Sequence, residues 1–118
     1  MLRDGVVTTD GPLPDGAVVD RGILAAMESL LEIYRAPLMA ELPPLQGGLM
    51  GFLGFDVVRE VEQLPEGGAD DRGLPDAVMS MIGSLVAFDH WRQRAYVLES
   101  VAVHGLDAAG IDAAYDAA

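Results

Sequence analysis

Cysteine is absent from this chain of 118 residues. Disulfide bonds, zinc sites built from thiolates and cysteine nucleophiles are therefore excluded. Basic residues are scarce, since seven lysines and arginines stand against 19 aspartates and glutamates, and the net charge is −12. Binding to phosphates needs clustered basic side chains, so this balance argues against nucleic acid as a partner and against anionic membrane surfaces.

Targeting and membrane segments are also lacking. Residues 1–10 have no apolar core of the kind that a signal peptide needs. The longest strongly apolar run, residues 47–55, is shorter than the about 20 residues of a membrane-spanning helix. We therefore expect a cytoplasmic protein with no membrane partner.

Apolar residues are plentiful, at 51% of the chain, which is enough to build a core. The length fits one small domain or a piece of a larger protein, and at this size the buried fraction of the surface is modest. Glycine, with 14 residues, has roughly twice its usual share, which predicts tight turns or close approaches of the backbone.

The first part of the sequence predicts a short strand and then a helix. Residues 6–8 suit a strand, and the prolines and glycines of residues 11–16 predict turns. Residues 21–35 form the predicted helix, because apolar side chains recur there at spacings of three and four. Asp20 is its expected N-cap, and Pro37 ends it.

The middle of the sequence predicts a buried strand followed by a second helix. Residues 47–55 alternate glycine with large apolar residues and carry no charge, so we expect a strand that packs closely against another layer. Asp56 is the expected N-cap of a helix over residues 57–64. Pro65 ends this helix, and the polar, glycine-rich residues 66–73 predict an exposed loop.

The last part of the sequence predicts an antiparallel hairpin and a helix. Residues 77–90 and 95–103 are interpreted as its two strands, joined by a short turn. Residues 106–118 predict a final helix that Asp107 caps. Because this helix is still in progress at Ala118, we expect a truncated chain.

Together these elements predict an α+β (α/β-like) fold, in which an antiparallel sheet packs against two or three helices. We expect this fold to be a fragment of a larger two-layer domain. Open sheet edges in such a fragment would favour self-association.

The glycines at positions 48, 51 and 54 raise the question of a phosphate-binding loop. Their spacing matches neither G-x-G-x-x-G nor G-x-x-x-x-G-K-[ST], and no lysine follows. Close packing of the strand is the favoured interpretation, and binding of a nucleotide is not expected.

Charged residues after the glycine segment recur at spacings of three, at Asp56, Arg59 and Glu62. Arg59 can pair with either carboxylate along one face of a helix. The favoured interpretation is a helix cap with a surface ion pair, and a contact to another domain or to a ligand is the alternative.

No other group of residues amounts to an active site. Glu66, Asp70 and Asp71 lack the ladder of spaced carboxylates that a calcium loop needs. Asp89 and His90 are neighbours in a predicted strand, so their side chains point to opposite faces and form no dyad. The sequence therefore predicts no catalytic residue, no metal site and no cofactor in this chain.

Three stretches, in a fixed order, resemble one family. They are PPLQGGLMGFLGFDVVREVEQLP (residues 43–65), DDRGLPD (residues 70–76) and VAFDH (residues 86–90). Their pattern is similar to the amino-terminal domain of the chorismate-utilising enzymes, typified by anthranilate synthase component I. The positions that match this family pattern are Gly47, Gly48, Gly51, Phe52, Gly54, Phe55, Asp56, Arg59, Glu62, Leu64 and Pro65.

The resemblance implies that residues 1–118 are part of the amino-terminal domain, without the catalytic domain that binds chorismate. The full family enzyme converts chorismate and ammonia to anthranilate and pyruvate in tryptophan biosynthesis, using magnesium, and a glutamine amidotransferase subunit supplies the ammonia. By this resemblance the motif residues are structural and the chain alone is inactive. Its expected partner is the absent catalytic domain of the same protein.

Two alternatives stay open. Aminodeoxychorismate synthase component I, of the folate pathway, shares the glycine segment, although DVVR (residues 56–59), the DDRGLPD loop and FDH (residues 88–90) look more like anthranilate synthase. The chain could also be a free-standing module that binds a small ligand near the glycine strand.

Overall fold

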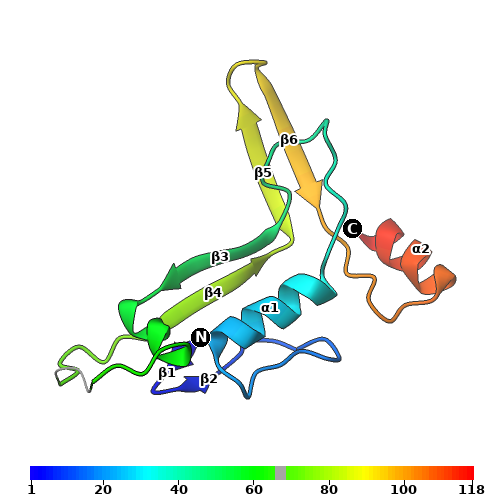
Figure 1. Ribbon diagram of the computed structural model, residues 1–118. Coiled ribbons are helices and arrows are strands. Elements are labelled where there is room, and N and C mark those ends of the chain that lie inside the picture. Colours follow the sequence, from blue (N-terminus) through cyan, green and yellow to red (C-terminus); the bar gives the residue numbers. More distant parts are fainter. Residues whose placement is uncertain (66–68) are drawn as a thin grey trace. The chain divides into compact units, whose positions relative to one another are not determined.

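The computed structural model of the protein describes residues 1–65 and 69–118. Its fold is α+β with antiparallel strand pairs, as predicted (Figure 1). The elements in chain order are β1 (Leu2–Arg3), β2 (Val6–Val7), α1 (Ile23–Ile33), β3 (Gly48–Leu53), the 3-10 helix η1 (Phe55–Glu60), β4 (Ala77–Ile82), β5 (Ser84–Asp89), β6 (Arg94–Glu99) and α2 (Ala108–Ala117).

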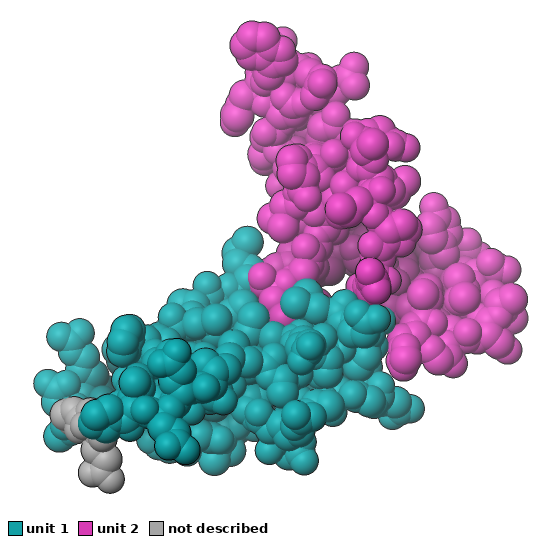
Figure 2. All heavy atoms as spheres, viewed as in Figure 1, with its two compact units in different colours: residues 1–33, 50–80 teal, residues 34–49, 81–118 magenta. Residues whose placement is uncertain are grey.

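The chain divides into two compact units (Figure 2). The first unit contains residues 1–33 and 50–80, and the second contains residues 34–49 and 81–118. Of the predicted loop at residues 66–73, residues 66–68 lie outside the described part of the chain.

A four-stranded sheet in the order β2-β1-β4-β3 lies mostly in the first unit, while residues 48–49 of β3 and 81–82 of β4 are counted with the second. The strand β1 pairs antiparallel with β2 and with β4, so that Leu2 lies opposite Val7 on one side and Ala77 on the other. Asp4 and Gly5 connect β1 to β2 with positive φ at both positions, as a tight two-residue hairpin turn requires. Strand β1 is not among the predicted elements, although an Asp-Gly pair is a hairpin signal.

The core of the first unit lies where α1 and η1 meet this sheet. Four buried apolar side chains form it, namely Leu2, Ile23, Val57 and Ala77. Val7, Leu24 and Met27 pack against this core and are only partly buried. The apolar stripe predicted for α1 is thus buried at its start, while Leu31 and Tyr34 at its far end are exposed.

Two predicted helix starts are wrong. The helix α1 begins at Ile23 rather than Arg21, because Gly22 has a φ of +94° that cannot continue a helix. The predicted second helix is a 3-10 helix over Phe55–Glu60, and its N-cap is Gly54 without a capping side chain. Asp56 lies inside the first turn of η1 instead of capping it, and its carboxylate is bound to Arg59.

The second unit contains the antiparallel hairpin of β5 and β6, which confirms that prediction. Its register runs through six residue pairs, from Ser84 opposite Glu99 to Asp89 opposite Arg94. The single strand predicted over residues 77–90 is in fact two strands, β4 and β5, that are separated at Gly83. The strand β6 ends at Glu99 rather than Val103.

The predicted Asp107 cap of α2 is confirmed, because its carboxylate accepts a hydrogen bond of 2.8 Å from the Gly110 amide. The helix itself begins at Ala108 rather than at residue 106. None of its residues is buried. Within residues 1–65 and 69–118, no helix combines the length and the apolar character that crossing a membrane demands.

Candidate functional site

The glycine-rich segment, residues 47–62, is the candidate site because it carries the family pattern. Its first two glycines, Gly47 and Gly48, have φ values of +151° and +126°, a backbone conformation that side chains disfavour. Its other two glycines approach the backbone of the neighbouring strand. A β-carbon at Gly51 would overlap the carbonyl oxygen of Val78, and one at Gly54 would lie 2.8 Å from the carbonyl oxygen of Asp76.

These close approaches support the interpretation that the glycines let this segment pack closely against the neighbouring backbone. The amide of Gly54 donates a hydrogen bond of 2.7 Å to the Asp76 carbonyl, which is the group that a side chain at Gly54 would crowd. No phosphate-binding geometry is needed to explain why glycine stands at these positions. Their role in the family motif stays a prediction.

The prediction that this strand is buried is wrong. Large apolar side chains on β3 and just after it are exposed, at Met50, Phe52, Leu53 and Phe55. The strand β3 lies at the edge of its sheet, beside β4. Its side chains are apolar enough for a buried position, but the described residues of this chain do not cover them.

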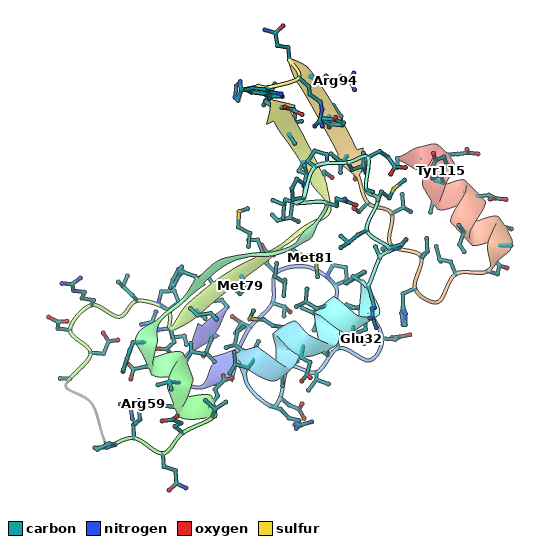
Figure 3. The ribbon with its side chains drawn as sticks, turned by 45° about the horizontal axis from the view of Figure 1, so that its top comes forward. Glu32, Arg59, Met79, Met81, Arg94 and Tyr115 are labelled. Atoms are coloured by element: carbon teal, nitrogen blue, oxygen red, sulfur yellow. The ribbon has the colours of Figure 1, made fainter. Side chains whose placement is uncertain are left out.

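Arg59 joins the start of η1 to the segment that follows it (Figure 3). Its Nε donates to Asp56 Oδ1 at 2.7 Å, and its Nη1 donates to the carbonyl oxygens of Leu64 and Pro65 at 3.3 and 2.9 Å. The predicted ion pair therefore forms with Asp56, and Glu62 takes no part in it. Because both partners are partly exposed, the pair stabilises the local turn only weakly.

Glu60 has a role that sequence reasoning missed. Its two carboxylate oxygens accept hydrogen bonds of 2.7 and 2.9 Å from the amides of Ile23 and Leu24. The first amides of a helix lack partners inside the helix, and a carboxylate also interacts favourably with the positive end of the helix dipole. Glu60 therefore takes the place predicted for Asp20 and ties η1 to the start of α1.

Gly22 makes this contact possible. A β-carbon at Gly22 would lie 2.5 to 2.7 Å from the atoms of the Glu60 carboxyl group. The positive φ of Gly22 also turns the chain into the helix. A signal for this cap is hard to find in the sequence, because Glu60 and Ile23 are 37 positions apart.

Aspartates at two turns hold lowered pKa values. The backbone amides of Gly73 and Arg72 donate to Asp70 Oδ1 and lower the pKa of this exposed carboxyl below its usual value near 3.8. At the hairpin turn the backbone amide of Arg92 has the largest effect in lowering the pKa of Asp89, and the Arg92 guanidinium adds to it at 3.2 Å. Both carboxylates are thus occupied in shaping turns.

A pocket of about 400 Å³ lies in the second unit, between residues 40–44 and the hairpin. Its polar lining includes Glu41, Asp89, Arg92 and Tyr96. The Asp89 carboxylate is already bound to the amides of its own turn and to Arg92. No buried polar side chain among the described residues points into this pocket.

The described residues also contain no cluster of metal-binding side chains and no buried polar side chain. Residues 1–65 and 69–118 contain no cluster of three or more His, Asp or Glu side chains that could hold a metal ion. They also contain no buried polar or charged residue. Glu66 of the predicted acidic loop lies outside the described residues, while Asp70 and Asp71 are exposed.

Comparison with known proteins identifies relatives in sequence. The chain is 39% identical, over 89 residues, to anthranilate synthase component 1 of Mycolicibacterium smegmatis, an alignment that spans 75% of this chain and 17% of that protein. It is 36% identical, over 99 residues, to anthranilate synthase component 1 of Thermus thermophilus, across 82% of this chain and 20% of that protein. No family model matches the chain.

The fold agrees with the sequence. The crystal structure of anthranilate synthase component I from Streptococcus pneumoniae matches with a TM-score of 0.57 at 26% identity, and the match covers 98% of this chain. This chain is related to anthranilate synthase component I. The chain spans only 17% and 20% of the two sequence relatives and 25% of the solved anthranilate synthase chain.

The relation to anthranilate synthase component I bears on the three stretches that carry the resemblance. The resemblance stated from residues 43–65, 70–76 and 86–90 is confirmed at the level of the family. The first stretch folds as β3 and η1 in this chain, and the third folds as the second half of β5.

Proposed function

We propose that this chain is an amino-terminal, non-catalytic segment of anthranilate synthase component I. In this proposal the complete component, with a glutamine amidotransferase subunit, converts chorismate and ammonia from glutamine to anthranilate and pyruvate in tryptophan biosynthesis. The proposal includes a cytoplasmic location.

One observation carries the proposal. The chain matches anthranilate synthase component I in sequence and fold, yet it spans about a fifth of each sequence relative. Its described residues contain no cluster of three or more His, Asp or Glu side chains that could hold a metal ion. The relatives named above are anthranilate synthase components, which favours this pathway over the aminodeoxychorismate synthase alternative.

Magnesium is implied for the family enzyme, and the donor set of this chain does not fit it. Magnesium prefers carboxylate and other oxygen ligands in a compact octahedral arrangement. Residues 1–65 and 69–118 provide no cluster of three acidic or histidine side chains. We therefore derive no step through magnesium in this chain.

The contacts of the glycine-rich segment support a structural role for it. The glycines allow β3 and β4 to approach each other, Glu60 binds η1 to the start of α1, and Arg59 binds η1 to the segment that follows it. In this proposal the segment is a scaffold, and its contribution to activity is to support a catalytic part that lies outside this chain.

A complementation assay tests the proposal. The M. smegmatis component 1 is prepared without the stretch that aligns with this chain, and the preparation is accepted only if its own aligned segment restores anthranilate formation from chorismate, ammonia and magnesium. We expect no anthranilate from the present chain alone and restored formation when it is added to this preparation. Anthranilate formed by the chain alone, or no restoration at all, would contradict the proposal.

A further inference from the structure

The two faces of the β5–β6 hairpin differ in what covers them. In an antiparallel pair, residues directly opposite each other lie on the same face. The pairs Leu85–Leu98 and Ala87–Tyr96 belong to a face that is buried or half-buried. The pairs Val86–Val97 and Phe88–Ala95 belong to the other face, which is exposed.

We define the open hairpin face as Val86, Phe88, Ala95 and Val97. Phe88 is 69% exposed and Val97 is 81% exposed. The chain's single tryptophan, Trp91, is 94% exposed in the turn that joins the two strands. Burial of large apolar side chains stabilises a fold, and these side chains of the hairpin make little of that contribution.

The hairpin is also open at its edges. The strands β5 and β6 form a two-stranded sheet, so each has one hydrogen-bonded edge and one open edge. An isolated two-stranded hairpin is marginally stable in water. Monomeric soluble proteins rarely leave a contiguous apolar patch of this kind exposed unless a partner covers it. Tryptophan is moreover the residue type most enriched among side chains that dominate binding energy.

Size and charge indicate what covers this face. The solved anthranilate synthase chain is matched over only 25% of its length by 98% of this chain, so most of that polypeptide has no counterpart here. A second copy of this chain fits poorly, because two molecules that each carry a net charge of −12 repel each other. The four residues of the open hairpin face carry no charge, as suits a contact within one folded polypeptide. The exposed pair Ser84–Glu99 continues the same side of the hairpin and places one carboxylate at the end of this apolar patch.

We propose that the open hairpin face, together with Trp91, docks onto the part of an anthranilate synthase component I polypeptide that this chain does not contain. This inference rests on the proposed function and adds the surface through which the scaffold is joined to the catalytic part. The exposed apolar side chains Met50, Phe52 and Leu53 of β3 belong to the other unit and are not part of this surface.

Fluorine NMR on Trp91 tests the docking without any substitution. Trp91 is the only tryptophan, so the full chain labelled with 5-fluorotryptophan gives one resonance. We expect this resonance to shift and to lose its solvent isotope effect when the unlabelled M. smegmatis preparation described above is added. An unchanged resonance in a mixture that forms anthranilate overturns the docking proposal and leaves the proposed function intact.

The same sample separates the other outcomes. A resonance that shifts with the concentration of the chain alone would show that a second copy covers the face, and would overturn the proposal. A mixture that neither forms anthranilate nor shifts the resonance would overturn the docking proposal and the proposed function together.

A matched pair of substitutions locates the contact on the open hairpin face. Val97→Asp places a charge on that face, whereas Leu38→Asp places a charge at a side chain that is 83% exposed outside the hairpin. Burying an unpaired charge is costly, so we expect Val97→Asp to weaken binding to the preparation at least about tenfold and Leu38→Asp to leave it within about twofold. Equal effects of the two substitutions would overturn the proposal, provided that circular dichroism shows both variants folded.

Discussion

The two units of this chain differ in how much they bury. The first unit contains a core made by Leu2, Ile23, Val57 and Ala77, which come from two strands and two helices. In the second unit, Leu98 is the single buried apolar residue among those described. The comparison shows that strands can be regularly hydrogen-bonded without being buried. The β5–β6 hairpin pairs six residues on each strand, although few of its apolar side chains are buried.

The difference has a physical cause in how much of each sheet a helix covers. A helix covers part of the sheet in the first unit, where Ile23 of α1 contacts the side chains of β1 and β4. In the second unit α2 buries none of its residues, so the hairpin depends on its own turn and on the residues that precede it. In our account the missing cover comes from the rest of an anthranilate synthase component I polypeptide.

The largest expected effect is the loss of stability when a buried side chain is truncated, and this loss should differ between the two units. We expect Ile23→Ala to lower the free energy of unfolding by about 2 to 5 kcal/mol, because the buried cavity cannot collapse fully. Leu98→Ala should cost less, since its surroundings in the second unit are open enough to relax. Urea denaturation of both variants measures the two losses, and a larger loss for Leu98→Ala would reverse the comparison.

The next effect concerns the close approach of β3 and β4. We expect Gly51→Val to lower the free energy of unfolding by about 1 to 3 kcal/mol through overpacking, because its β-carbon would overlap the Val78 carbonyl. Gly83→Ala is the matched control, since a β-carbon there meets only the Ser100 carbonyl at 3.8 Å. An unchanged denaturation midpoint for Gly51→Val would show that the two strands do not approach as described.

A smaller effect is expected from the cap on α1. Glu60→Ala removes both acceptors of the Ile23 and Leu24 amides, and losing a helix cap costs about 0.5 to 2 kcal/mol. Glu62→Ala changes an exposed neighbour outside this contact and should stay within about 0.5 kcal/mol. If thermal denaturation shows equal losses for the two variants, Glu60 does not anchor the helix.

The smallest effect belongs to the hairpin turn and depends on pH. The pKa of Asp89 in the folded chain is lowered, chiefly by the Arg92 amide. A lowered pKa means that the stabilisation is present above the ordinary value near 3.8 and is lost as the pH falls through the folded value. Amide NMR signals of Trp91 and Arg92 should therefore shift below about pH 4, and Asp89→Asn should abolish this shift. A shift that persists in Asp89→Asn would assign it to another group.

Local features of the fold could be predicted from the sequence, and features that depend on distant residues could not. The hairpin follows from two apolar stretches around a turn, and the Asp107 cap follows from its position three residues before Gly110. The cap on α1 could not be predicted in the same way, because its carboxylate comes from Glu60 and a nearer candidate, Asp20, stood in the expected place.

The candidate site shows the same limit. The glycine segment was recognised as a strand, and its glycines do approach a neighbouring backbone at Gly51 and Gly54. The prediction that this strand is buried was wrong. Apolar composition indicates that side chains favour burial, but it does not show whether residues of this chain bury them. Phe52, which is 51% exposed on β3, illustrates that difference.

Hydrogen exchange tests the central comparison most directly. The amides of β5 and β6 are measured in the chain alone and in the mixture with the M. smegmatis preparation, with the amides of β1 and β4 as the internal reference. We expect the hairpin amides to exchange rapidly in the chain alone and to become protected in the mixture, while the reference amides change little. Hairpin amides that are as protected in the chain alone as in the mixture would contradict it.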